Sequence, residues 1–250
     1  MSIPTFLDFR WLSYGVKRYI PLDLDSHPHI CFVGATGSGK SYALTLLLGR
    51  MAMHKEAHFV VCDFKNTSFN FLSGHTGFYG YTDVIEGIET VYQEFQERLR
   101  LSDENRNRQK IILLVDEYAA LIASLPKREA EEVRAKIFNI LCLGRELSVH
   151  LVVGVQRAAA ELFSLGSRDQ FGAIIMLGNL SKEQKMMLVP DYRDEMNQNN
   201  ARGEGYMYLD GEGLYHIKVP RVSDSERLHR TIASRMWNIP TPDASDACEA

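Results

Sequence analysis

The sequence predicts an α/β fold, in which helices cover both faces of a largely parallel sheet and a β-hairpin lies near the C-terminus. Short apolar runs, typical of strands buried on both faces, lie at residues 30–33, 58–63, 111–115, 149–155 and 173–177. Helical spacing of apolar residues marks the segments 83–101 and 128–143. Residues 205–219 have the strand–turn–strand pattern of a hairpin. At 250 residues, one such domain is expected, with two small domains as the alternative.

Composition favours a cytoplasmic protein. No apolar run approaches the ~18–20 residues that a membrane span needs, and the first residues lack the pattern of a signal peptide. Cys31, Cys62 and Cys142 lie in apolar stretches and Cys248 lies near the C-terminus, so we expect buried reduced thiols rather than disulfides or metal ligands. The net charge of −4 neither indicates nor excludes nucleic acid, because an assembly can collect positive charge in a pore.

The two ends of the chain are expected to differ in order. Residues 3–25 alternate aromatic and polar side chains, which indicates one or two strands. We take residues 1–26 as a strand segment that packs on a domain of residues 27–237. Residues 238–250 contain two prolines and small polar side chains, which is typical of a flexible tail.

Smaller elements complete the prediction. Residues 78–81 are expected to form a short strand. Ser181 is placed to cap a short helix, because its hydroxyl can accept a hydrogen bond from an amide of the first turn. Residues 191–202 read as a polar loop, and residues 224–237 as the last helix.

A glycine-rich motif follows the first buried strand. Residues 34–41 read G-x-x-x-x-G-K-S, between an apolar run and a helix-compatible run at 42–48. In that context the loop amides and the helix dipole bind phosphates, the lysine reaches the terminal phosphates and the serine hydroxyl binds Mg²⁺. The alternative is a glycine-rich turn that matches the motif by chance. The sequence therefore predicts ATP and Mg²⁺ as ligands. The candidate nucleotide-binding residues are Gly34, Ala35, Thr36, Gly37, Ser38, Gly39, Lys40, Ser41 and Tyr42.

A second strand ends in two acids. Five consecutive aliphatic residues at 111–115 run into Asp116 and Glu117. In a parallel sheet this end lies beside the phosphate cradle, so Asp116 is predicted to hold the Mg²⁺ shell and Glu117 to polarise the attacking water. The alternative is a helix start capped by an acid, and the pairing with the glycine-rich motif favours the catalytic interpretation.

Other strands also end in polar residues. Asp63 and Lys65 follow the strand at 58–63, where open α/β sheets place their ligands, with a solvated turn as the alternative. Gln156 ends the strand at 149–155 and is predicted to sense the γ-phosphate, unless it is an ordinary strand-end amide.

Together these motifs resemble the FtsK/SpoIIIE branch of P-loop motors within the HerA–FtsK superfamily, and most of all the FtsK-like coupling ATPases of conjugative elements. The resemblance spans roughly residues 27–237. Its further motifs are His27-Pro28-His29, Asp63-x-Lys65, Val115-Asp116-Glu117-Tyr118-Ala119, Gly144-Arg145-x-x-x-Val149-His150-Leu151, Gln156-Arg157, the stretches 168–172 and 177–183, and Gly203-x-Gly205-Tyr206-Met207-Tyr208.

The resemblance implies a RecA-like P-loop NTPase fold and an ATP-driven motor that threads double-stranded DNA as a ring hexamer, with single-stranded DNA as the less expected substrate. It implies that Arg145 acts as an arginine finger on the neighbour's γ-phosphate, with Arg157 and Arg168 as the next candidates. The alternative for Arg145 is a surface charge favoured by the helix dipole.

The resemblance also places DNA-facing loops after two strands. They correspond to Lys65, Asn66, Thr67 and Ser68, and to Lys127 and Arg128. Both contain the cations and small polar groups that contact phosphates without reading bases.

The resulting expectation is an ATP-hydrolysing DNA translocase that serves conjugative transfer or mobile-element DNA processing. Larger relatives carry membrane spans, a further ring domain or a winged helix, none of which is seen here, so a relaxase or a membrane-anchoring partner is expected. The alternatives are a protein-translocating ATPase of the type VII secretion type and a nucleotide-regulated adaptor for a relaxase or replication initiator.

Overall fold

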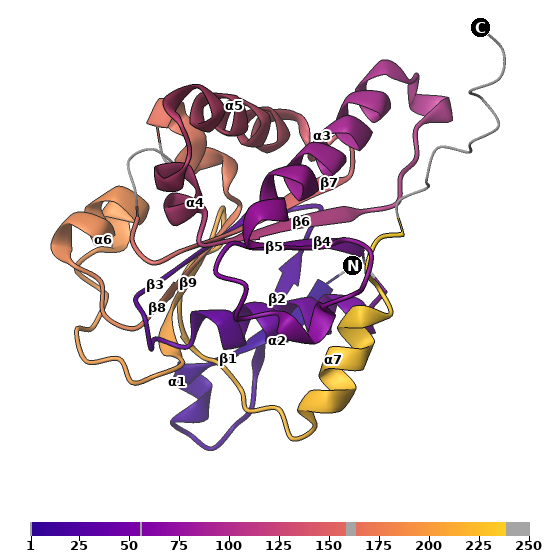
Figure 1. The fold of residues 1–250 in the computed structure, drawn as a ribbon. Coiled ribbons are helices and arrows are strands. Elements are labelled where there is room, and N and C mark those ends of the chain that lie inside the picture. Colours follow the sequence, from indigo (N-terminus) through magenta and orange to yellow (C-terminus); the bar gives the residue numbers. More distant parts are fainter. Residues whose placement is uncertain (1, 56, 159–163, 239–250) are drawn as a thin grey trace, which may run out of the picture.

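The structure is a computed structural model that describes residues 2–55, 57–158 and 164–238. A sheet forms the centre of the fold. Within these residues ten strands form one mixed sheet in the order β2-β1-β10-β9-β8-β3-β7-β6-β4-β5 (Figure 1). Six of the strands are parallel to one another, which confirms the predicted largely parallel sheet. They are β3 (Ile30–Gly34), β4 (His58–Asp63), β5 (Phe78–Gly80), β6 (Ile111–Asp116), β7 (Val149–Val155) and β8 (Ala173–Leu177).

The remaining four strands are antiparallel. The predicted hairpin is present as β9 (Glu204–Leu209) and β10 (Gly213–Lys218), and β9 pairs with β8. Near the N-terminus, β1 (Ser2–Asp8) pairs with both β10 and β2 (Tyr19–Asp23), so the first strand of the chain lies next to one of the last. The turn of the hairpin contains Gly211 at φ 75°, a left-handed conformation that glycine adopts without steric cost.

Helices cover both faces of the sheet (Figure 1). The α-helices are α1 (Phe9–Leu12), α2 (Lys40–Met53), α3 (Val84–Arg100), α4 (Tyr118–Ser124), α5 (Lys127–Leu143), α6 (Lys182–Leu188) and α7 (Ser225–Ala233). Short 3₁₀ turns lie at Asn70–Leu72, Tyr81–Asp83, Asp103–Asn105, Ser164–Gln170 and Pro190–Tyr192. Helices α3, α4 and α5 pack on one face and α2 and α7 on the other.

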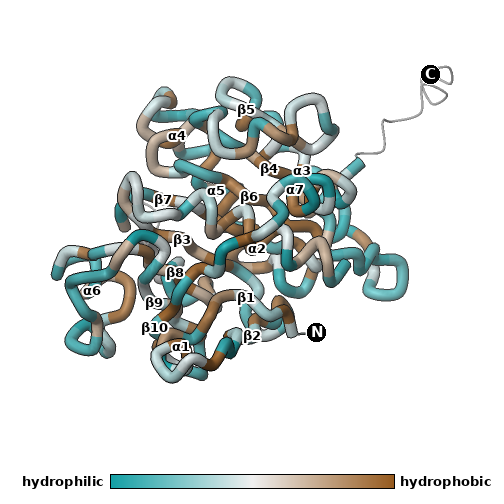
Figure 2. The backbone as a smooth tube through the Cα atoms, turned by 90° about the horizontal axis from the view of Figure 1, so that it is seen from below, coloured by the Kyte–Doolittle hydropathy of each residue, from teal (hydrophilic) through white to brown (hydrophobic). Residues whose placement is uncertain are grey.

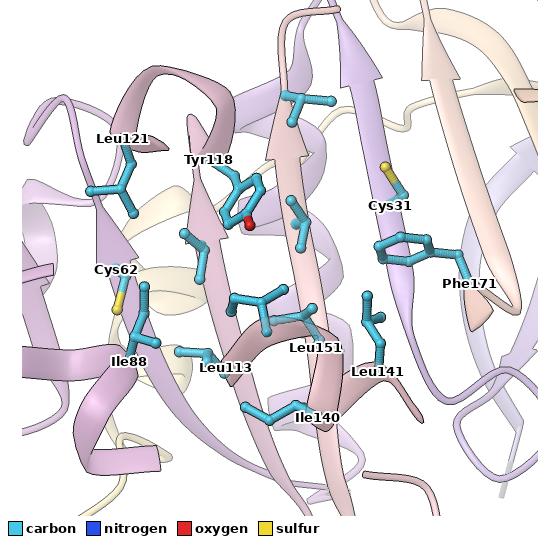
Figure 3. Close-up of a cluster of buried hydrophobic side chains, with 14 of the residues drawn as sticks. Cys31, Cys62, Ile88, Leu113, Tyr118, Leu121, Ile140, Leu141, Leu151 and Phe171 are labelled. Carbon is cyan, nitrogen blue, oxygen red and sulfur yellow. The ribbon is translucent and has the colours of Figure 1, made fainter. Parts of the chain in front are cut away.

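The aliphatic run of β6 is explained by its two buried faces. Ile111, Leu113 and Val115 contribute to the cluster under α3–α5, whereas Ile112 and Leu114 contribute to the cluster under α2 and α7. Figure 3 shows the first of these clusters, in which residues from the strands meet side chains of α3, α4 and α5. Burial of each such side chain stabilises the fold by about 1.5–3 kcal/mol. In Figure 2 the hydrophobic colour follows the central strands.

Several local predictions need correction. The last helix ends at Ala233 rather than at residue 237, because Trp237 N donates a hydrogen bond to Phe59 O at 2.9 Å and the chain there runs beside β4. Cys31 and Cys62 are buried, but Cys142 is exposed because it lies on the outer side of α5. Helix α1 was not predicted.

Two further predictions concern the ends and the surface. Cys248 and residues 239–250 of the expected tail lie outside the described residues. Lys127 and Arg128, expected in a loop, form the first turn of α5.

Within the part of the chain that the structure describes, no helix is both long and apolar enough to cross a membrane.

Candidate nucleotide site

The glycine-rich loop joins the end of β3 to the start of α2. Gly37 and Gly39 have φ values of 85° and 98°, so both need the left-handed conformation that glycine permits. Helix α2 begins at Lys40 with no side-chain cap and no acidic residue in its first turn. The amides of that turn and the positive end of the helix dipole are therefore available to an anion.

Lys40 connects this helix to the tip of β6. Its side chain is only 6% exposed, and its Nζ donates a hydrogen bond to Asp116 Oδ1 and lies 3.4 Å from Glu117 Oε1. Strand β7 lies between β3 and β6, and the residue of β7 that pairs with both Phe32 and Asp116 is Gly154. A β-carbon on Gly154 would overlap Asp116 Oδ1 and lie 3.1 Å from Lys40 Nζ. The missing side chain at this position lets lysine and aspartate meet.

Asp116 and Glu117 have different electrostatic environments. Asp116 is 1% exposed, and burial raises the pKa of its carboxyl group, against the attraction of Lys40. Burial also tends to raise the pKa of Glu117, but the Lys40 and Lys65 cations and the Gln156 amide outweigh it and hold that pKa below its usual value. Glu117 is therefore ionised at neutral pH, which a general base requires.

The backbone of Glu117 is also unusual. Its φ of 61° and ψ of 37° lie in the left-handed region, which a residue with a side chain rarely adopts. The conformation directs the chain from β6 into α4 while the Glu117 amide donates to Asp116 Oδ1 at 3.0 Å. Such strain is characteristic of functional sites, where the surrounding structure maintains it.

The donor set fits a hard cation that shares its ligands with phosphate and water. Asp116 Oδ2 is buried and has no hydrogen-bond partner, and Ser41 Oγ accepts a hydrogen bond from Ser68 Oγ at 3.0 Å. No cluster of three or more His, Cys, Asp or Glu side chains in the described residues could hold a metal alone. Magnesium usually takes one or two protein oxygens and completes its shell with phosphate and water.

Two neighbouring strand ends supply further polar groups to Glu117. Gln156 follows β7, and its Nε2 donates to Glu117 Oε2 at 3.1 Å. Lys65 follows β4, and its Nζ lies 3.1 Å from Glu117 Oε1. Asp63 is fully buried rather than solvated, and its Oδ2 accepts hydrogen bonds from the amides of residues 67–69 at 2.9, 2.7 and 3.0 Å. Asp63 therefore anchors the loop that carries Lys65.

A cavity of about 320 Å³ collects most of the predicted residues. It is lined by Gly34, Ala35, Thr36, Gly37, Gly39, Lys40, Ser41, Tyr42, Lys65, Thr67, Ser68, Glu117, Gln156 and Arg202. An adjoining cavity of about 500 Å³ shares Gly39, Tyr42 and Arg202 with it. Tyr42 also has a structural role, because its hydroxyl accepts a hydrogen bond from Val222 N at 2.7 Å.

Not all predicted residues join this site. Arg145 is exposed in the turn that precedes β7. It therefore lies at the amino-terminal end of this strand, opposite the end that carries Gln156. Arg157 lines another adjoining cavity, of about 510 Å³, which shares Gly34, Ala35 and Gln156 with the nucleotide cavity. Arg168 donates to Leu188 O at 2.8 Å and lies over the Tyr208 ring. Asn66 is exposed in the loop after β4, and Ser38 is buried beneath the glycine-rich loop. Lys127 and Arg128 are exposed on α5, and Arg128 pairs with Glu132.

Sequence reasoning missed two contributors. Gly154 could have been noticed as a glycine inside an apolar strand, which often marks a close approach. Arg202, the second, had no local signal, whereas its neighbour Gly203 belongs to a motif of the family resemblance. Gly203 N donates to Ser38 O at 2.9 Å, so the segment before β9 packs against the glycine-rich loop.

Comparison with known proteins agrees with this geometry. Residues 13–104 match the FtsK/SpoIIIE family. The chain is 23% identical over 206 residues to the Ftsk domain-containing protein YdcQ of Bacillus subtilis, covering 76% of this chain and 42% of that protein. It is 23% identical over 249 residues to the DNA translocase FtsK of Treponema pallidum, covering 88% of this chain and 30% of that protein. The chain thus spans less than half the length of both relatives.

Solved structures share the fold. The pCW3 conjugation coupling protein TcpA, bound to ATPγS, superposes with a TM-score of 0.73 at 19% identity, over 94% of this chain and 69% of that one. The type VII secretion ATPase EccC of Thermomonospora curvata gives a TM-score of 0.70 at 22% identity, over 94% of this chain and 30% of that one. The match over residues 13–104, the sequence relatives and the shared fold together support an FtsK-type P-loop ATPase.

Proposed function

We propose that this chain is the motor part of an ATP-driven DNA translocase that acts as a ring oligomer, a hexamer by its resemblance, in conjugative transfer or mobile-element DNA processing. The observation that carries the proposal is that Lys40, Glu117 and Gln156, from three strand ends, line one cavity, with Asp116 buried against Lys40. The names of relatives support the choice of DNA, since several are DNA translocases and one structural neighbour is a conjugation coupling protein.

The residues divide the reaction between binding and proton transfer. The loop amides and Lys40 bind the β- and γ-phosphates, and Lys40 exchanges its contact with Asp116 for a phosphate oxygen. Ser41 and Asp116 would hold Mg²⁺, which neutralises charge that develops on the transferred phosphate. Glu117 accepts a proton from the attacking water, and Gln156 senses the γ-phosphate through a hydrogen bond. The adjoining cavity beside Tyr42 and Arg202 leaves room for the nucleoside.

Partners of the reaction are proposed from the same resemblance. Arg145 completes the site of a neighbouring subunit, and duplex DNA contacts the loop at Lys65–Ser68 and the start of α5 at Lys127 and Arg128. A relaxase or a membrane-anchoring protein directs the motor to its DNA. The motor corresponds to residues 27–237, on which the strand segment of residues 1–26 packs.

The test is the ATPase rate of the full chain without DNA, with single-stranded DNA and with duplex DNA, across protein concentration. We expect duplex stimulation, a requirement for duplex length and a steep rise of specific activity with concentration. Lys40→Ala is the negative control, with its melting temperature compared because it leaves Asp116 buried without its cation. ATP hydrolysis that no DNA stimulates would favour a protein substrate, and a monomer with negligible turnover would favour an adaptor.

A further inference from the structure

The Glu117 carboxylate is held by three donors at once. Oε1 lies 3.1 Å from Lys65 Nζ and 3.4 Å from Lys40 Nζ, and Oε2 accepts the hydrogen bond from Gln156 at 3.1 Å. A water that Glu117 is to activate must compete with these donors for the same oxygens. The carboxylate seen here is therefore restrained, and its release requires that a partner leave.

Lys65 is the partner that can leave. Its side chain is 45% exposed, compared with 6% for Lys40, which is also bound to Asp116. Gln156 is half-buried and carries no charge. Ion pairs that solvent reaches are weak and screened, so Lys65 exchanges Glu117 for another anion more readily than Lys40 does.

The loop that carries Lys65 is itself fixed. Asp63 accepts hydrogen bonds from the three amides of residues 67–69. Ser68 Oγ donates to Ser41 Oγ at 3.0 Å, which ties the loop to the first turn of α2. The flexible Lys65 side chain can therefore change partner while its backbone keeps its place beside the nucleotide cavity.

We propose that Lys65 is a positioning residue that restrains Glu117 until a DNA phosphate captures the Lys65 ammonium, which couples DNA occupancy to ATP hydrolysis. The inference rests on the proposed function and assigns its regulation to one side chain. A DNA phosphate is an anionic acceptor of the same kind as a carboxylate, so the two compete for one ammonium. With Lys65 turned to DNA and Lys40 turned to the nucleotide, Glu117 keeps only the neutral Gln156.

The experiment compares Lys65→Met and Lys65→Arg in the full chain with Lys136→Met as the matched control. Lys136 forms a partly exposed ion pair with Glu89 at 2.5 Å between α5 and α3, outside the site. ATPase rates are measured without DNA and with saturating linear duplex, and duplex affinity is measured by fluorescence anisotropy. We expect Lys65→Met to raise the DNA-free rate roughly three- to tenfold, as loss of a screened ion pair allows, and to bring the ratio of stimulated to DNA-free rates near one. Lys65→Arg should keep most of the stimulation, and Lys136→Met should change neither rate.

Two results would overturn the inference while the proposed function survives. An unchanged DNA-free rate, weaker duplex binding and full stimulation at saturation would make Lys65 only a DNA contact. An equal loss of both rates in Lys65→Met would make it a direct aid to catalysis. A wild-type chain that hydrolyses ATP without any response to duplex would remove the DNA coupling, and one that hydrolyses no ATP under any condition would remove the proposed function itself.

Discussion

The Lys40 ammonium reaches the Asp116 carboxylate across β7, over the only residue of that strand that has no side chain, Gly154. Phe32, Gly154 and Asp116 are in register across β3, β7 and β6. The lysine of the glycine-rich motif and the acid at the tip of β6 therefore meet, although a strand separates β3 from β6.

Gly154→Ala should disrupt this position without unfolding the chain. The added methyl group would overlap Asp116 Oδ1, and overpacking of this kind costs about 1–3 kcal/mol. We expect ATP affinity to fall by about tenfold or more, measured by titration calorimetry. Val152→Ala is the control, because Val152 lies on the same face of β7 in the core. Val152→Ala should lower the melting temperature and leave ATP affinity unchanged. If Gly154→Ala and Val152→Ala bound ATP with equal affinity, the role of Gly154 would be contradicted.

Glu117→Gln should separate binding from turnover. The amide keeps the size of the side chain but cannot accept a proton from water, and a general base contributes about 10²–10⁴ to the rate. We expect ATP to bind with similar affinity while the ATPase rate falls by about that factor. Glu86→Gln, at an exposed position in the first turn of α3, should leave the rate unchanged. Full activity of Glu117→Gln would show that another group activates the water.

Arg145 should act only on a neighbouring subunit. It precedes β7, whereas the nucleotide cavity lies beyond the other end of this seven-residue strand, roughly 20 Å away. We expect Arg145→Ala alone to lower the ATPase rate by about 10³ or more. Mixing it with Lys40→Ala should restore part of the activity, since one subunit supplies the intact cavity and the other the arginine.

A mixture of Lys40→Ala and Glu117→Gln is the control for that experiment. Both changes lie in the same cavity, so no subunit of that mixture has a complete site and no activity should return. An active Arg145→Ala protein would move the assignment to Arg157, whose exposed side chain lies beside Gln156.

Two buried histidines should make stability depend on pH. Burial lowers the pKa of His29 to about 3 and that of His150 to about 4, below the ordinary value of 6.5. In the unfolded chain both take up protons near pH 6.5, so the unfolded state binds more protons between pH 6.5 and about 4. The free energy of unfolding should therefore fall as pH drops through that window, by about 1.4 kcal/mol per pH unit for each fully coupled proton.

His29→Asn tests this prediction, because the amide oxygen can still accept the hydrogen bond that Leu151 N donates to His29 Nδ1 at 3.0 Å. Urea unfolding between about pH 7 and pH 5 should show a smaller loss of stability in His29→Asn than in the wild type. His75→Gln, at an exposed histidine, should follow the wild type. If the free energy of unfolding depended on pH identically in all three proteins, His29 would not be the group that titrates.

Much of the fold could be predicted because the determining signals are local. Strands β4, β7 and β8 begin and end at the predicted residues, since each is an apolar run buried on both faces. The capping box at Ser181 and the hairpin of β9 and β10 also depend on neighbouring residues alone. The last helix was predicted too long because Trp237 bonds to Phe59 in β4, a contact that helical spacing cannot reveal.

The sequence by itself determined the glycine-rich loop and the acids at the tip of β6, because a glycine-rich turn and a doubly buried strand are encoded within a few residues. Tertiary structure decided which groups meet there. Lys65 and Gln156 contact the Glu117 carboxylate, and Lys40 contacts Asp116 at the position of Gly154. These contacts depend on the order of β3, β7, β6 and β4 in the sheet and on their register, which are set by packing between segments distant in the chain.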